Sequence, residues 1–368
     1  MNTFALRKAA LPSTGVTTTL ATACATGLAA ACLFASAPAA AATLSALNLA
    51  RPEGVRHVLL ATPERHTPGK RALVILLHGH GGSAAQLLGQ GRGAAPLSVW
   101  LHIAEREQLL LAAPDGVNGQ DGKTGWNDCR ADAPNNPKTD DTGLIGALID
   151  KAVAEYDVDP ARVYVMGMSN GGMMAYRLAA EIAPRLAGFA AVSASMAAKN
   201  ACAPATVALP ALIIAGTADP IVPYGGGDVR FSSLLRSRGT VLPVEESAAS
   251  WRALANLPAA PASSDVAHRD HSDPTHATRL LWGADPRKVQ VELLRIDKGG
   301  HVEPSMTKRF GWIFTQFIGK QNGDIEAAEE AWSFFKDKRA GLQPVLMAAP
   351  PATPPAAPPA ASPAASHP

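Results

Sequence analysis

The segment Gly167-Met168-Ser169-Asn170-Gly171 constrains the fold of this chain more than any other feature. It follows an apolar run, Arg162–Met166, that is typical of a buried strand, and it precedes a stretch of helical character, Gly171–Ile182. The two glycines permit a tight turn from strand to helix, and the turn leaves Ser169 projecting above the helix N-terminus. The helix dipole and the free N–H groups there favour negative charge. Ser169 is therefore a candidate nucleophile, and the alternative is a serine that only caps the helix.

Short apolar runs alternate with helical stretches over most of the chain, which is the pattern of βαβ units. Further strands are predicted at Arg71–Leu77, Leu109–Ala113, Phe189–Ser193, Leu212–Ala215 and Val289–Ile296. Helices are predicted at Ser98–Gln108, Thr142–Tyr156 (with Asp140 or Asp141 as its N-cap), Glu245–Leu257, Phe310–Ile318 and Asp324–Lys338. We therefore expect an α/β fold in which helices flank a mostly parallel central sheet.

The N-terminal segment has the composition of a secretory signal peptide. Residues 1–42 contain Arg7 and Lys8, then an uncharged stretch rich in Ala and Thr, and small residues suited to cleavage after Ala37 or Ala42. An uncleaved anchor and a lipidated cysteine are the alternatives, but the stretch is weakly apolar for a membrane span. We expect export to the periplasm or the medium, with no membrane span in the mature chain.

The C-terminal segment, residues 348–368, is rich in Pro and Ala and has no Lys, Arg, Asp or Glu. This composition favours a disordered, solvated spacer over a linker to a further module. One domain is then expected at residues 43–347. Without Arg7 and Lys8, the 33 basic residues of the chain fall to 31 and equal its 31 acidic residues. A neutral chain without a basic run argues against a nucleic-acid partner.

Two cysteines, Cys129 and Cys202, lie beyond the predicted signal peptide. An even number in an oxidising compartment makes one disulfide a reasonable expectation. The bridge would close a loop of about 73 residues and contribute ~4 kcal/mol in the chain-entropy treatment. Two buried free thiols are the alternative.

Two residues downstream could complete a hydrolytic site with Ser169. A serine hydroxyl is a weak nucleophile and needs a base, which an acid must in turn orient. Asp219 follows the predicted strand Leu212–Ala215, and His301 follows the predicted strand Val289–Ile296. Parallel strands bring such loops to one sheet edge, so the order Ser, Asp, His favours a catalytic triad over a turn-capping Asp and a surface His.

A glycine-rich turn, Leu77-His78-Gly79-His80-Gly81-Gly82-Ser83, follows an early strand and could direct a backbone N–H at a tetrahedral oxygen. We favour the N–H of His80 as this donor, with the N–H of Asn170 as its partner. His78 and His80 form only a weak metal pattern, because no further ligands lie nearby in the sequence. We expect no metal and no organic cofactor.

Several other segments are expected near this edge. Trp126, in a polar loop, either lines a substrate pocket or is a buried hydrophobe. The segments Gly225–Arg238 and Pro258–Lys288 should form a lid or rim over the site, where substrate choice is set. The second of them contains three histidines in a Pro-containing stretch without helical period, which favours a flexible surface loop over a metal site: His268, His271 and His276.

The motifs occur in a fixed order along the chain: Leu77-His78-Gly79-x-Gly81-Gly82, Gly125-Trp126-Asn127, Asp140-Asp141, Gly167-Met168-Ser169-Asn170-Gly171-Gly172, Gly216-Thr217-Ala218-Asp219-Pro220-x-Val222-Pro223-Tyr224 and Gly300-His301. With them the chain resembles the secreted polyhydroxybutyrate depolymerase and feruloyl-esterase family of α/β hydrolases over about Leu73 to Phe317. The resemblance implies the α/β-hydrolase fold, with a lid or rim insertion between Asp219 and His301. We take Trp126 and Tyr224 as candidate substrate contacts.

The chain departs from that family in two places. Members often have Trp-Pro-Gly after the catalytic histidine, whereas Val302-Glu303-Pro304-Ser305 stands here. Extracellular polymer depolymerases usually add a substrate-binding module, whereas only the Pro/Ala segment follows here. Soluble oligomers and small esters therefore remain open as substrates.

These observations together predict a secreted serine carboxylic-ester hydrolase, most like a polyhydroxybutyrate depolymerase acting on 3-hydroxyalkanoate oligomers. The alternatives are an esterase of the feruloyl or acetyl-xylan type, an acyltransferase using the same site, and a non-catalytic surface binding protein. A peptidase is disfavoured, because the sequence offers no pocket acid for a charged side chain. The sequence predicts neither the natural ester nor the oligomeric state.

Overall fold

The computed structural model of the protein describes residues 42–65, 67–231 and 236–341. The predicted signal peptide, apart from its last residue, and the predicted Pro/Ala segment lie outside the described residues. All described residues belong to one compact unit. Within them, no helix is both long enough and apolar enough to cross a bilayer.

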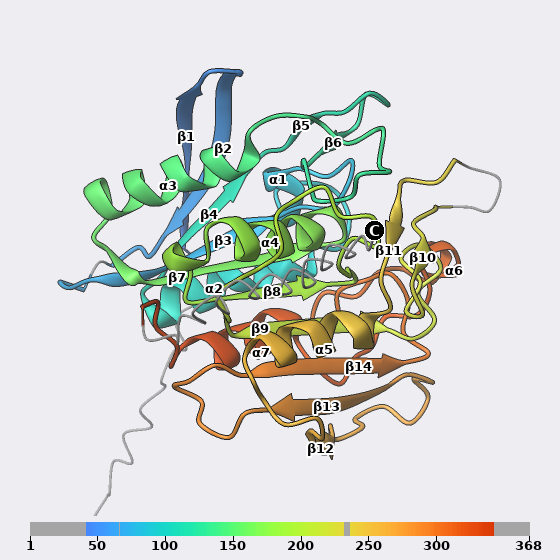
Figure 1. Cartoon of the computed structure of the whole chain (residues 1–368). Helices are drawn as coiled ribbons and strands as arrows, with labels where there is room; N and C mark the ends of the chain where they lie inside the picture. Colours follow the sequence, from blue (N-terminus) through green and yellow to red (C-terminus); the bar gives the residue numbers. More distant parts are fainter. Residues whose placement is uncertain (1–41, 66, 232–235, 342–368) are drawn as a thin grey trace, which may run out of the picture. The chain divides into compact units, whose positions relative to one another are not determined.

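A ten-stranded sheet organises the molecule, in the order β1-β2-β4-β3-β7-β8-β9-β14-β13-β12 (Figure 1). Its strands are β1 (Thr43–Arg51), β2 (Gly54–Thr62), β3 (Arg71–Leu77), β4 (Leu110–Pro114), β7 (Val158–Met168), β8 (Gly188–Val192), β9 (Ala211–Gly216), β12 (Ala262–Asp265), β13 (His276–Trp282) and β14 (Val291–Asp297). Two small hairpins pair β5 (Val117–Asn118) with β6 (Thr124–Gly125), and β10 (Gly227–Asp228) with β11 (Thr240–Val241).

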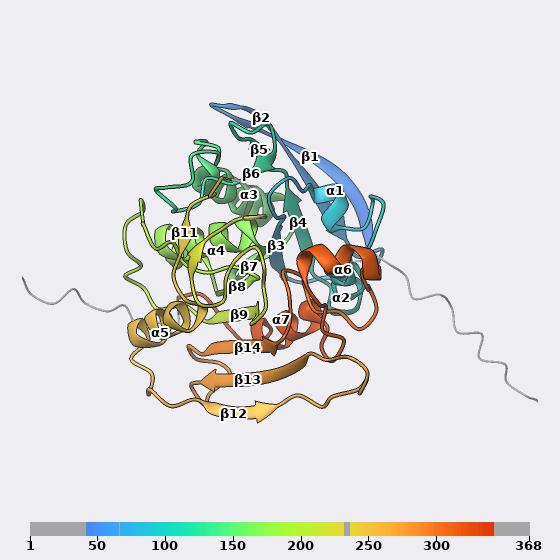
Figure 2. The same cartoon turned by 90° about the vertical axis from the view of Figure 1, so that its right-hand side faces the viewer.

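The central six strands, from β4 to β14, run parallel to one another, as predicted. Each edge is extended by two antiparallel strands, β1 and β2 on one side and β13 and β12 on the other. In Figure 2 the first pair lies at the upper edge of the sheet and the second pair at the lower edge. The prediction that Pro258–Lys288 covers the site is wrong, because its two strands, β12 and β13, pair with each other and with β14 at the edge of the sheet.

Helices cover both faces of the sheet, and this explains why the central strands are apolar on both sides. Alternate residues of β3 enter different cores: Leu73, Ile75 and Leu77 enter one, and Ala72, Val74 and Leu76 enter the other. The first core also contains α3 (Asp141–Glu155), α4 (Asn170–Glu181) and α5 (Val244–Leu254). The second contains α2 (Trp100–Glu107) and α7 (Ala327–Phe335).

The remaining helical elements are short and lie in connections: α1 (Ala84–Leu87), α6 (Trp312–Ile318), and the 3₁₀ turns η1 (Pro96–Val99) and η2 (Ala183–Arg185). Asp140 is the N-cap of α3, because its side chain accepts a hydrogen bond from the N–H of Gly143 at 2.8 Å. The candidate residues follow the carboxyl ends of β3, β7, β9 and β14. Parallel strands thus bring them to one edge of the sheet.

Candidate active site

Ser169 occupies a strained turn between β7 and α4, with φ 56° and ψ −121°. A non-glycine residue rarely adopts a positive φ, and such strain is characteristic of a nucleophile held at a sharp turn. The neighbouring positions must be glycine because the turn leaves no room for a Cβ atom there. A Cβ on Gly167 would lie 2.1 Å from the carbonyl oxygen of Gly171, and one on Gly171 would lie 2.3 Å from that of Leu77. The sequence motif is therefore a packing requirement of this turn.

The structure brings Ser169, His301 and Asp219 into one hydrogen-bonded chain. The Oγ atom of Ser169 lies 2.9 Å from Nε2 of His301, and Nδ1 of His301 lies 2.7 Å from Oδ2 of Asp219. Asp219 and His301 are both buried. The predicted order along the chain thus corresponds to a real spatial arrangement, although the three residues come from three different loops.

The carboxylate of Asp219 is held in place by nearby backbone N–H groups. The second carboxylate oxygen of Asp219 accepts hydrogen bonds from the N–H groups of Ile221 and Val222, each at 2.8 Å. The N–H of His301 donates to the carbonyl oxygen of Ile318, at the end of α6, at 2.6 Å. Two backbone N–H groups therefore hold the carboxylate of Asp219, and a third hydrogen bond holds the backbone of His301.

The glycine-rich turn after β3 lies against Ser169, since a Cβ on Gly79 would be 3.5 Å from the Cβ of the serine. The N–H of Gly81 donates to the carbonyl oxygen of Thr124 at 2.7 Å, and the N–H of Gly82 donates to that of Gly79 at 3.0 Å. In the described part of the chain, no hydrogen bond uses the N–H of His80. Asn170 is the first residue of α4, where a backbone N–H lacks a partner within the helix.

The two histidine rings of this turn have separate protein partners. Nε2 of His78 accepts a hydrogen bond from the N–H of Gly116 at 2.9 Å, and its Nδ1 donates to the carbonyl oxygen of Gly79 at 2.8 Å. Nε2 of His80 lies 3.0 Å from a carboxylate oxygen of Asp121. Burial lowers the pKa of both rings, against the opposing effect of nearby carboxylates. His78 is thus a neutral structural link within the turn.

The expectation that Trp126 contacts substrate is wrong. Its side chain has no exposed surface, and its indole N–H donates to the carbonyl oxygen of His78 at 2.8 Å. Tyr224 is half-buried, and its hydroxyl donates to Glu245 of α5 at 3.1 Å. Burial beside Glu245 raises the pKa of Tyr224. Trp126 supports the turn from behind instead of meeting a ligand.

The side chain of Asn170 has a role that sequence reasoning missed. Its Oδ1 accepts a hydrogen bond from the N–H of Trp126 at 2.7 Å, and its Nδ2 donates to Oδ2 of Asp128 at 2.7 Å. Asp128 also binds Arg130 through both carboxylate oxygens, at 2.6–3.1 Å. These bonds tie the start of α4 to a loop more than 40 positions away. An Asn directly after the serine and a distant Asp-x-Arg segment form too weak a sequence pattern to predict these hydrogen bonds.

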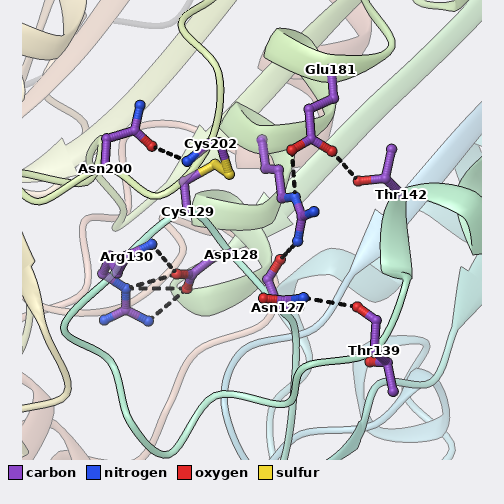
Figure 3. The surroundings of a disulfide bond; sticks show 10 residues. Asn127, Asp128, Cys129, Arg130, Thr139, Thr142, Glu181, Asn200 and Cys202 are labelled. Atoms are coloured by element: carbon purple, nitrogen blue, oxygen red, sulfur yellow. Dashed lines mark hydrogen bonds and ion pairs between the residues drawn. A yellow bond between two sulfur atoms is a disulfide. The ribbon is translucent and has the colours of Figure 1, made fainter.

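Cys129 lies within that loop and is joined to Cys202 by a disulfide, with the two Cα atoms 5.3 Å apart. Figure 3 shows the bridge beside the Asp128–Arg130 ion pair. Of the two outcomes left open by the sequence, the structure has the disulfide. Among the described residues, the two sulfurs and Glu181 form the one group of three clustered metal-ligand atoms. Disulfide sulfurs are not thiolates and do not bind metal in that role.

The remaining predicted segments have mixed outcomes. Val229 and Arg238, from the segment Gly225–Arg238, line the small pocket around Ser169, so this part is a rim of the site. The three histidines of the other segment gather at the far edge of the sheet, with ring centroids 4.4–5.5 Å apart. Nδ1 of His268 pairs with Asp324 at 2.9 Å, which raises the pKa of the ring.

Comparison with known proteins adds the family. Residues 63–242 match the family described as Phospholipase/Carboxylesterase, a match that includes Ser169 and Asp219. The chain has the α/β-hydrolase fold. Its resemblance to feruloyl esterases and polyhydroxybutyrate depolymerases is confirmed by relatives of those names.

Three relatives show the range of esterases to which the chain is similar. A putative esterase, NocK, from Nocardia uniformis is 35% identical over 161 residues, which are 43% of each chain. A probable feruloyl esterase C from Aspergillus terreus is 26% identical over 50% of this chain and 62% of its own. A poly(3-hydroxybutyrate) depolymerase from Ralstonia pickettii is 30% identical over 29% of this chain and 22% of its own. The chain thus spans less than two thirds of the length of these relatives.

Proposed function

We propose that the protein is a serine carboxylic-ester hydrolase that works through an acyl-enzyme. The observation that carries the proposal is the hydrogen-bonded chain from the Oγ of Ser169 to His301 and Asp219, built on a strained turn. The strained turn at Ser169, the order of the three residues along the chain and the distances between them agree with the requirements of an activated serine. The related esterases support the same chemistry.

The first half of the reaction acylates the serine. Nε2 of His301 removes the proton of Ser169 as Oγ attacks the ester carbonyl carbon. The carboxylate of Asp219 accepts the Nδ1–H of the ring, which fixes the tautomer and stabilises the imidazolium. The N–H groups of His80 and Asn170 bind the oxyanion. The ester bond then breaks, and the alcohol leaves with the proton held on Nε2.

The second half returns the serine to its resting state. Water enters the place of the alcohol, gives a proton to Nε2 of His301 and attacks the acyl carbon. The tetrahedral oxygen is bound by the same two N–H groups. Collapse of this intermediate breaks the bond to Ser169, returns the proton to Oγ and releases the carboxylic acid.

The natural ester is proposed to be a 3-hydroxyalkanoate oligomer, as for a polyhydroxybutyrate depolymerase. The motif order and the depolymerase relative support this substrate. A second candidate is a feruloyl or acetyl-xylan ester, which is favoured by the more extensive match to the feruloyl esterase from Aspergillus terreus. Secretion is proposed from the N-terminal composition, and the disulfide supports it, because such bonds persist in oxidising compartments.

One panel of assays tests the proposal. Purified protein is given 3-hydroxybutyrate oligomers, methyl ferulate, acetylated xylan and short nitrophenyl esters, with Ser169→Ala as the inactive control. We expect at least one ester class to be hydrolysed and the substitution to lower kcat by about 10⁴-fold or more. A fluorophosphonate should label Ser169 stoichiometrically. Activity that survives Ser169→Ala, or folded protein that resists labelling, would overturn the mechanism.

A further inference from the structure

A cavity of about 330 Å³ lies beside helix α4, outside the small pocket around Ser169. We call it the α4 cavity. One wall is α4 itself, with Met173, Tyr176 and Ala180, and another is α5, with Trp251 and Leu254. Two loops close it, residues 128–130 and 196–205, and the disulfide shown in Figure 3 joins these loops. A cavity of this volume falls in the range of ligand-binding pockets.

The chemistry of the wall selects an uncharged occupant. Its lining is mainly apolar side chains, including two aromatic rings whose centroids are 6.4 Å apart, Tyr176 and Trp251. The charged groups in the wall, Asp128 and Arg130, are paired with each other and almost completely buried. Arg130 also donates to the carbonyl oxygen of Arg238 at 2.5 Å. A charged ligand would have no free opposite charge to pair with there. An aryl or alkyl group would exchange contact with water for contact with apolar side chains, which is favourable.

The α4 cavity extends in line from the serine. Met173, Tyr176 and Ala180 follow helical spacing and therefore share one face of α4, which begins directly after Ser169. At 1.5 Å per residue, Tyr176 lies roughly 10 Å and Ala180 roughly 16 Å from Ser169 along the axis. Met173 and Arg130 line both the pocket around Ser169 and the α4 cavity. These two side chains form the partition between the two spaces.

We propose that the α4 cavity binds the distal, uncharged apolar part of the acyl group whose carbonyl carbon is attacked by Ser169. This proposal rests on the proposed function, and it names the substrate class as esters with an extended aryl or alkyl acyl group. Met173 separates the two spaces and must shift for the acyl chain to pass. Methionine suits this position, because its unbranched side chain has three rotatable bonds and adapts to its neighbours.

A substitution that fills the far end of the cavity tests the proposal. Ala180→Phe should lower kcat/KM for 4-nitrophenyl dodecanoate at least tenfold and leave that for 4-nitrophenyl acetate within twofold, because acetate does not reach past Met173. Ala154→Phe, on the exposed part of α3, is the matched control and should change neither value. Equal loss on both esters, or no loss on dodecanoate, overturns the assignment.

Two further measurements separate this proposal from the proposed function. Ser169→Ala should bind methyl dodecanoate in a calorimetric titration, and the double variant Ser169→Ala/Ala180→Phe should not. Loss of binding in the double variant supports the cavity even if no ester is hydrolysed, whereas equal binding by both contradicts it. If Ala180→Phe does not fold, Ala205→Phe fills the cavity from the opposite loop and carries the same expectations.

Discussion

The carboxylate of Asp128 accepts a hydrogen bond at 2.7 Å from the side-chain amide of Asn170, the residue directly after the candidate nucleophile. The same carboxylate neutralises Arg130, and both side chains are almost fully buried. One acid therefore fixes the start of α4 and compensates a buried cation. The loop that carries it is thereby part of the support of the active site.

Replacement of Asp128 should be costly for stability. Asp128→Ala leaves the guanidinium of Arg130 buried without its partner, and breaking such a pair typically costs about 3–5 kcal/mol. Urea unfolding of the variant and of the wild type measures the difference. The double variant Asp128→Ala/Arg130→Met should recover a large part of it, because it also removes the uncompensated charge. A loss below about 1 kcal/mol in the single variant would contradict a buried, coupled pair.

Replacement of Asp219 should affect the rate and spare the fold. Asp219→Asn keeps the size of the side chain but presents the wrong partner to Nδ1 of His301, so kcat should fall by about 10⁴-fold. Steady-state kinetics on a soluble nitrophenyl ester measures it. Asp265→Asn is the control, because Asp265 is exposed on the edge strand β12, in the same interval of the chain, and should leave kcat within twofold. Comparable losses in both variants would contradict the assigned acid.

Lys338 should make stability depend on alkaline pH. Burial lowers its pKa to about 8, while its ammonium donates to Pro286 and Gln290, each at 2.9 Å. The unfolded chain keeps its proton to about pH 10.4 and so binds more protons than the folded chain above pH 8. Between these values, stability therefore rises with pH, by an amount on the order of 3 kcal/mol for this group.

The contribution of Lys338 can be isolated by comparison with Lys338→Met. Denaturant unfolding at pH 7 and pH 10 should show the wild type gaining stability relative to this variant as the pH rises. Lys336→Met removes an exposed ammonium two positions away and should show no such relative gain. If the wild type and Lys338→Met keep a constant difference, the pKa of the buried lysine is not lowered.

Two tryptophans should respond in opposite ways to substitution. Trp126 has no exposed surface, so Trp126→Ala should cost about 3–5 kcal/mol in the free energy of unfolding. Trp312 on α6 is 74% exposed, so Trp312→Ser should change that free energy by less than about 1 kcal/mol. Thermal or urea unfolding of both variants measures the contrast. Similar costs would mean that one of the two side chains is placed differently in solution.

The central part of the fold was predictable because its sequence pattern is local. The strand β7, the turn at Ser169 and the helix α4 are adjacent in the chain, and each has a clear composition. The edge strands were not predicted. All four residues of β12 are exposed, and β1 has one buried position, so neither shows the alternation that marks a half-buried strand. Their place is set by pairing with distant strands.

The site divides in the same way between what the sequence could reveal and what it could not. The order of Ser169, Asp219 and His301 is visible because each follows a recognisable strand. Whether Trp126 faces a ligand or the core depends on a bond to the carbonyl oxygen of His78, 48 positions away in the chain. No pattern around the tryptophan reports that bond. The α4 cavity depends likewise on how α5 and two loops pack against one helix face.

Because of the Cys129–Cys202 bridge, the compartment in which the protein is produced becomes an experimental variable. A compartment rich in small thiols keeps such cysteines reduced, whereas an exported chain is oxidised. Oxidised and reduced samples of one polypeptide have nearly the same mass, yet they differ in whether the loop beside Asp128 is tied to the segment around Cys202. Kinetic constants from two laboratories are therefore comparable only after free thiols have been counted.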